Sequence, residues 1–291
     1  MLTKIAIIGA GFLLSKLPYK VLEVVTHVLA RIYLAIPQKR KRLLFSNLTY
    51  AFPDWASYKI RKTAIQSTVQ LIEMGFFSLI YPHLSSAQRR STLIYSKKAE
   101  HELTRLKNEN KPTLILLPHI TLFESVVTSP VFRPSFGKKL GAVYRPNSNP
   151  IIDNWINKAR TDLGLSVFSR KKGLIQARKH LREGNWLILL FDQNAGLGGD
   201  LSLFMDRLCS ISPLPDIVLK GLDANIVLIT PLRKSFFCAE LKFSSIHNSE
   251  YENVSKWAHN KLENILNIHE EGLPEWLWSH GKWKTQDNAQ Q

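Results

Sequence analysis

Residues 113–124 read TLILLPHITLFE, and this stretch decides the fold. Its four apolar residues end at Pro118, so we predict a short buried strand that runs into a turn. His119 follows at the strand end, and Glu124 lies five positions later, at the start of a segment from Leu122 to Val127. Open α/β folds place their chemistry at the carboxyl ends of strands. A helix N-terminus also favours an anionic side chain. The stretch therefore predicts a site that contains an imidazole and a carboxylate.

His119 and Glu124 are residue types that can form a catalytic dyad. Imidazole serves as a general base near neutral pH, and a carboxylate beside it selects the tautomer and stabilises the imidazolium that forms. The alternative is a core histidine near an unrelated surface glutamate, because two-residue patterns are common.

Two further predicted strands end in charged residues. The strand Leu140–Tyr144 leads to Arg145, which suits a phosphate or an oxyanion but also an ordinary surface position. The apolar run from Asn185 to Phe191 leads to Asp192. That aspartate suits orientation of a ligand hydroxyl, pairing with Arg145, or capping of the next element.

A basic cluster precedes the predicted helix from Leu174 to Arg182. Arg170, Lys171 and Lys172 lie at its N-terminus, where positive charge opposes the helix dipole unless an anion binds there. The cluster therefore indicates a phosphate-bearing ligand, with a solvated loop as the alternative.

The amino-acid composition of the chain limits the kinds of partner that it can bind. The chain has 291 residues and a net charge of +16, which suits a phospholipid surface, nucleic acid or an acidic carrier protein. Nucleic acid is disfavoured, because the basic run Lys39–Arg42 adjoins an apolar segment and four of the seven tryptophans lie in the last 35 residues. Cys209 and Cys238 are too few for a disulfide framework or a cysteine metal site, which favours a reducing compartment.

The N-terminal region predicts membrane association. Ile5–Leu14 is an apolar run, too short to span a bilayer, which needs about 20 residues. Tyr19–Ile36 has apolar residues at helical spacing but also charges, as in an interfacial helix. The opening G-x-G resembles a dinucleotide-binding loop, but Leu14 replaces the third glycine and Pro18 comes too early for the helix.

Several motifs occur together in one order along the chain. They are H-x(4)-E at 119–124, N-L-x-x-A-F-P at 47–53, R-P-x-x-N-P at 145–150, a strand ending in D-Q at 192–193, and WLWSHGKWK at 276–284. This set resembles the bacterial lipid A late acyltransferase family, of the H-x(4)-D/E glycerolipid acyltransferases. One departure concerns Leu203–Met205, where relatives carry a P-F-F-G type segment. This departure affects the identity of the acceptor substrate more than the acyl-transfer chemistry.

The resemblance implies an α/β fold, with a mixed sheet flanked by helices and an N-terminal helical membrane anchor. We expect an anchor region at 1–94, an acyltransferase domain at 95–284 and a polar tail at 285–291. His119 and Glu124 would be catalytic, in a one-step transfer without cofactor or metal. The co-substrate would be an acyl carrier protein or CoA thioester.

The expected acceptor is a hydroxyl of a lipid A precursor or similar glycolipid, at the cytoplasmic face of the bacterial inner membrane. Expected partners are therefore the bilayer, this glycolipid and acyl carrier protein. One alternative is another membrane lipid, such as a phosphatidylinositol mannoside, an ornithine lipid or an aryl-polyene lipid. The other is a non-enzymatic membrane- or nucleic-acid-binding protein. The sequence does not predict an oligomeric state.

Overall fold

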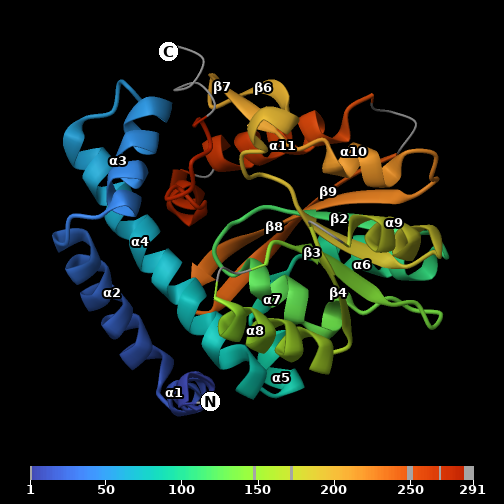
Figure 1. The fold of residues 1–291 in the computed structure, drawn as a ribbon, viewed down its shortest axis with the longest axis horizontal. Helices are drawn as coiled ribbons and strands as arrows, with labels where there is room; N and C mark the ends of the chain where they lie inside the picture. Colours follow the sequence, from blue (N-terminus) through green and yellow to red (C-terminus); the bar gives the residue numbers. More distant parts are fainter. Residues whose placement is uncertain (1, 147–148, 171–172, 248–251, 269, 285–291) are drawn as a thin grey trace.

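A seven-stranded sheet forms the centre of the computed structural model, which describes residues 2–146, 149–170, 173–247, 252–268 and 270–284 (Figure 1). The strand order is β1-β9-β8-β2-β5-β3-β4. Neighbours are parallel except for the antiparallel pair β8 and β9, so the predicted mixed sheet is confirmed. The strands are β1 (Leu93–Tyr95), β2 (Thr113–Leu117), β3 (Leu140–Tyr144), β4 (Leu165–Ser169), β5 (Trp186–Leu190), β8 (Asn225–Ser235) and β9 (Cys238–His247).

Helices cover both faces of the sheet. Because side chains alternate along a strand, Leu114 and Leu116 of β2 face one layer and Ile115 and Leu117 face the other. The first layer holds α9 (Leu174–Arg182), α10 (Leu214–Leu219) and α11 (Val254–Ile268). The second holds α6 (Lys97–Asn108), α7 (Phe123–Thr128) and α8 (Pro150–Asp162). The central strand is therefore buried on both sides, as its unbroken apolar run predicts.

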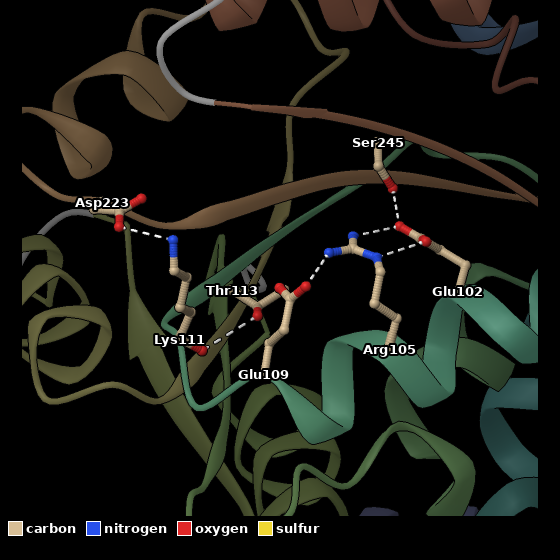
Figure 2. Close-up of polar contacts among 7 residues, drawn as sticks. All are labelled: Glu102, Arg105, Glu109, Lys111, Thr113, Asp223 and Ser245. Atoms are coloured by element: carbon tan, nitrogen blue, oxygen red, sulfur yellow. Dashed lines mark hydrogen bonds and ion pairs between the residues drawn. The ribbon is translucent and has the colours of Figure 1, made fainter.

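The connection into β2 is braced by ion pairs, which Figure 2 shows. Arg105 near the end of α6 lies 2.7 Å from Glu102 and 2.6 Å from Glu109. Lys111 lies 2.8 Å from Asp223, which precedes β8. These exposed or partly exposed contacts join α6 and the start of β8 to the segment before β2, and they stabilise the fold little.

The N-terminal helices lie along one side of the sheet (Figure 1). They are α1 (Leu2–Ser15), α2 (Tyr19–Ala35), α3 (Lys39–Ala51) and α4 (Ser57–Ile80), followed by the short η1 (Tyr81–His83) and α5 (Ser86–Ser91). No single helix in the described ranges is both long and apolar enough to cross a bilayer; α2 and α3 meet that test only as a pair bent by 93°. The membrane anchor therefore stays a prediction, as does the proposed division into domains.

The helical pattern from Tyr58 to Ile94 predicts a core face of Ile65, Val69, Ile72, Phe76 and Leu79, but helix α4 buries a different face. Of the expected core residues, Val69 is buried, whereas Ile65, Ile72, Phe76 and Leu79 are only partly buried. The fully buried positions are Ile60, Thr63, Ala64, Ser67, Thr68, Val69, Glu73, Phe77 and Ile80. The helix packs against α1, α2, α3 and the C-terminal η5 (Glu270–Glu275), so polar residues are enclosed as well as apolar ones.

A buried ion cluster accounts for Glu73. Arg233 at the end of β8 donates to Glu73 at 2.7 Å and to Glu23 of α2 at 3.2 Å. The backbone N–H groups of Phe237 and Arg233 donate to Glu73 and Glu275, at 2.7 and 2.6 Å. The cluster joins α2, α4, β8 and η5. Burial raises the pKa of Glu73, although Arg233 opposes this rise.

The chain between 200 and 219 also differs from the prediction. A hairpin of β6 (Asp200–Phe204) and β7 (Arg207–Ile211) occupies the segment that departs from the family pattern. Met205 and Asp206 form its two-residue turn with φ of 52° and 54°. Such turns usually carry Asn-Gly, so the sequence lacks the usual signal for this hairpin. The sequence predicts a helix from Ile217 to Leu222, whereas helix α10 begins three residues earlier, at Leu214, and ends at Leu219.

Candidate active site

His119 lies directly beyond the end of β2, beside the end of β5. These strands are parallel neighbours, with Leu117 opposite Leu190, so residues just after the two strands come together. Nδ1 of His119 lies 2.6 Å from Oδ1 of Asp192, and the His119 backbone N–H donates to Oδ2 at 2.9 Å. Two strand-end residues predicted separately thus form one pair.

Asp192 is ionised and fully buried, at 1% exposure. Its Oδ2 also accepts the indole N–H of Trp276 at 2.8 Å. Burial alone would raise the pKa of this carboxyl, but His119, Trp276 and Lys282 outweigh it and hold the pKa well below its usual range. A carboxylate can only accept, so Nδ1 of His119 carries the proton and Nε2 is left free to act as a base.

The C-terminal segment fixes the turn that carries His119. Leu277 donates its N–H to the His119 carbonyl at 3.0 Å, and Thr121 donates its N–H to the Glu275 carbonyl at 2.9 Å. Ile120 and Trp276 form an isolated antiparallel bridge. The segment that resembles the family ending therefore belongs to the active site.

The aromatic residues of this segment are not at a bilayer surface. The motif at 276–284 leaves two placements open for its aromatic faces, near the entrance of the site or at the bilayer. Trp276, Trp278 and Trp283 are buried in the core, so the placement at the bilayer is wrong. His280 accepts the backbone N–H of Asn194 at 2.9 Å. Burial lowers the pKa of His280 to about 4, which keeps it neutral. The structural role predicted for His280 agrees with this contact.

Lys282 donates a hydrogen bond to the backbone carbonyl of Asp192, and the sequence did not predict this role. Its ammonium is completely buried and donates to the Asp192 carbonyl at 2.7 Å and to Nε2 of His259 at 2.9 Å. It also lies over the ring of Phe204, 5.3 Å from the centroid. Burial lowers the pKa of His259 to about 3, so this histidine is neutral and can accept. We call Asp192, Trp276, Lys282 and His259 the Asp192 cradle.

Glu124 does not occupy the orienting position that its spacing predicted. It lies in the first turn of α7, at 2% exposure, and both its oxygens accept from Arg160 of α8 at 2.9 Å. Between His119 and Glu124 the chain passes through Leu122, which has a left-handed φ of 63°. After this turn the glutamate side chain packs against α8, and Nδ1 of His119 is bonded to Asp192 instead.

Arg145 and Arg170 line a crevice beside His119, which we call the strand-end crevice. Its other lining residues include Tyr144, Gln193 and Ser212. Neither guanidinium has a hydrogen bond or ion pair with the described part of the chain. The predicted pairing of Asp192 with Arg145 is wrong, because the two carboxylate oxygens are used by His119 and Trp276. Lys171 and Lys172 lie outside the described residues.

A second crevice meets His119 from the side of the N-terminal helices, and we call it the helix-side crevice. It is lined by Tyr33, Arg40, Leu44, Ser67, Thr68, Gln70, Leu71, Met74, His119, Ile120, Thr121, Glu275, Trp276, Leu277 and Ser279. His119 is thus shared by two crevices, each of which also contains arginine. Such a geometry suits a base that acts on two substrates in one complex.

Comparison with known proteins gives one family. The sequence pattern described as bacterial lipid A biosynthesis acyltransferase matches residues 1–285. One similar protein is the lipid A biosynthesis acyltransferase 2 of Shigella flexneri, 22% identical over 259 residues. The matched region covers 84% of this chain and 77% of that protein.

Proposed function

The chain belongs to the bacterial lipid A biosynthesis acyltransferase family, and from this premise we propose that it moves a fatty acyl chain from a thioester to a hydroxyl of a lipid A precursor. The family and the acyltransferase activity are those that the motifs predicted. The observation that supports the finer proposal is the position of His119, which is bonded to Asp192 and shared by two crevices.

The reaction is a direct transfer. Nε2 of His119 removes the proton from the acceptor hydroxyl, and the oxygen attacks the thioester carbonyl carbon. The tetrahedral intermediate collapses when the carbon–sulfur bond breaks, and the leaving thiolate takes the proton from the imidazolium. Asp192 stabilises that imidazolium and keeps Nδ1 protonated. Glu124 has a positioning role in this proposal, because with Arg160 it holds the first turn of α7 beside the histidine.

The tetrahedral oxyanion needs a hydrogen-bond donor. The backbone N–H groups of residues 119, 120 and 121 are all bonded within the chain, to Asp192, Pro118 and Glu275. Arg145 and Arg170 have no such partners among the residues that the structure describes, and they line the crevice next to His119. These contacts favour a guanidinium over the turn as the oxyanion donor.

The thioester donor fits the strand-end crevice. Its arginines suit the phosphate of a phosphopantetheine arm, which acyl carrier protein and CoA share. An acyl-enzyme intermediate is disfavoured, because Ser125 is buried and donates to the Leu122 carbonyl, and burial raises the pKa of the Cys209 thiol. A covalent acyl adduct, detected by intact mass with donor alone, would contradict direct transfer.

The N-terminal helices support a membrane location. Many of the exposed large apolar side chains lie between residues 8 and 36, among them Phe12, Leu13, Val24, Val28, Ile32 and Ile36. The basic run Lys39–Arg42 follows, and each basic residue near an anionic bilayer stabilises binding by about 1 kcal/mol. We place the enzyme at the cytoplasmic face of the bacterial inner membrane on this basis.

Acyl transfer by purified protein tests this function. Wild type and His119→Ala are given labelled acyl carrier protein, with a lipid A precursor, a phospholipid or another glycolipid as acceptor. We expect transfer to the precursor, and its loss in the variant. Transfer to another acceptor alone would retain the chemistry and replace the substrate. Equal activity of the variant and wild type would contradict the role of His119.

A further inference from the structure

Two buried hydroxyl groups in the helix-side crevice have no hydrogen-bond partner in the part of the chain that the structure describes. They are Oη of Tyr33, on α2, and Oγ of Ser279, in the C-terminal segment. A buried hydroxyl without a partner costs about 1–3 kcal/mol, and most buried polar groups are therefore bonded. Two such groups in one crevice, beside the catalytic histidine, indicate that their partner is a ligand.

Arg40 adds a charge to the same crevice. It lies in the first turn of α3, is exposed, and has no hydrogen bond or ion pair with the described part of the chain. A free guanidinium is well suited to a phosphate, because its planar donors match two phosphate oxygens. The crevice thus combines a phosphate-binding group with neutral hydroxyls, as an anionic sugar headgroup requires.

The position of the crevice distinguishes it from the strand-end crevice. One wall is formed by α2 and α3, and the outer side of α2 carries exposed apolar residues, including Val24, Val28 and Ile32. A ligand held by lipid tails in a bilayer can reach this wall. The strand-end crevice, in contrast, is lined by residues at the carboxyl ends of β3 and β5 and in the loops that follow the strands.

We propose that the helix-side crevice binds the headgroup of the acceptor, a phosphorylated glycolipid. Arg40 pairs with a phosphate, Tyr33 and Ser279 bond polar atoms of the sugar, and the hydroxyl to be acylated then lies at Nε2 of His119. The crevice has little more space than a water molecule needs, so α2 and α3 must move outward when the headgroup binds. This assignment rests on the proposed function and adds the acceptor site to it.

Conservative substitutions test the crevice. Tyr33→Phe and Ser279→Ala each remove one hydroxyl that has no protein partner, so they should not destabilise the ligand-free chain. We expect each to raise the acceptor KM about 3- to 10-fold, the loss of one neutral hydrogen bond, with the donor KM unchanged. Thr230→Val is the matched control, because Thr230 also has a buried unpartnered hydroxyl but lines neither crevice. It should leave both KM values as in wild type.

Arg40 is tested against its neighbour in the basic run. Arg40→Ala and Arg42→Ala remove the same charge, but only Arg40 lines the crevice. We expect Arg40→Ala to raise the acceptor KM about 10- to 100-fold and to abolish the preference for a phosphorylated precursor over its dephosphorylated counterpart. In neutral detergent micelles, which contain no anionic lipid to bind the basic run, Arg42→Ala should change the KM less than about twofold and keep the preference.

The outcomes separate this proposal from the proposed function. Binding of labelled phosphorylated precursor in detergent micelles is measured alongside turnover, with the same variants. If wild type binds the precursor but transfers no acyl chain to it, the proposed function fails. The affinities of the variants for the precursor then still test whether the helix-side crevice binds it. If Tyr33→Phe and Ser279→Ala bind and turn over like wild type, water satisfies these hydroxyls and the crevice proposal fails. If Arg40→Ala and Arg42→Ala lose the same affinity for the precursor, Arg40 acts only as a general surface charge, and the crevice proposal fails.

Discussion

Two buried carboxylates near the histidine turn, Asp192 and Glu124, are held in different ways. Asp192 accepts from the imidazole, a backbone N–H and an indole, and has a lysine behind it. Glu124 is bonded on both oxygens to one guanidinium of the neighbouring helix. The first carboxylate sets the proton on the base, and the second joins α7 to α8. Nearness in sequence therefore does not identify the carboxylate that bonds the imidazole, because Glu124 lies five positions from His119 and Asp192 lies 73.

The strongest test of this difference is Asp192→Asn. An amide in this position can donate to Nδ1 and so favour the wrong tautomer, and it cannot stabilise the imidazolium. We expect kcat to fall by about a thousandfold or more, with the KM of either substrate little changed. Steady-state kinetics with circular dichroism as a fold control measure this. Trp276→Phe, which removes the indole donor together with part of a buried ring, should lose much less kcat. An Asp192→Asn enzyme with a tenth of wild-type kcat would remove Asp192 from the proposed chemistry.

Glu124→Gln should act first on stability. It leaves Arg160, at 12% side-chain exposure, without its ionic partner, and breaking a buried pair costs about 3–5 kcal/mol. Chemical denaturation should show this loss, and replacing both residues, as Glu124→Gln with Arg160→Met, should restore much of it. We expect the folded double variant to keep far more activity than Asp192→Asn. If it is folded and as inactive as His119→Ala, Glu124 takes part in the chemistry, as its spacing first predicted.

Lys282→Met tests whether the Asp192 cradle needs its buried charge. The change leaves the Asp192 carbonyl and Nε2 of His259 without their donor. We expect a loss of about 2 kcal/mol in the free energy of unfolding, together with a lower kcat. Lys284→Met, at an exposed position two residues later, should lose neither. A stable and fully active Lys282→Met would make the lysine a packing residue only.

Glu275 is a third buried carboxyl near His119, and its charge state is opposite to that of Asp192. Burial raises the pKa of Glu275 to about 8, although the backbone N–H of Arg233 opposes the rise. The folded chain therefore keeps a proton that the unfolded chain loses above its ordinary value of 4.5, and stability falls as pH rises between those values. We expect Glu275→Gln to gain at least about 1 kcal/mol relative to wild type between pH 5 and pH 8. A difference in melting temperature that does not change with pH would show that Glu275 is ionised throughout.

The sequence predicts elements of this fold better than contacts between them. The apolar runs give β2, β3 and β5, and each of these strands ends next to a residue that was singled out for the site. Apolar periodicity reports which positions are buried, but it does not report which strands are neighbours. The pairing of His119 with Asp192 depends on β2 lying beside β5, which no local pattern contains.

Arg160, Trp276 and Lys282 were missed for a related reason. Charged residues usually lie at the surface, so a helical arginine or a lysine between glycine and tryptophan gives no signal of burial. The face of α4 was misjudged because Glu73 is buried only with its partner Arg233, 160 positions away. The C-terminal segment was singled out in the sequence because it resembles the ending of the family, and not because of any physical pattern.

Completion of the active site by the C-terminal segment has a consequence for biosynthesis. Domains generally fold while the chain is being made, from the N-terminus onward. By the time the ribosome adds residues 276–283, the helices and strands made much earlier in the chain have been able to fold. Until that segment emerges, Asp192 lacks the Trp276 and Lys282 donors, and the histidine turn lacks its bond from Leu277. Chains cut short by interrupted translation before residue 276 therefore lack these contacts to Asp192 and to the histidine turn.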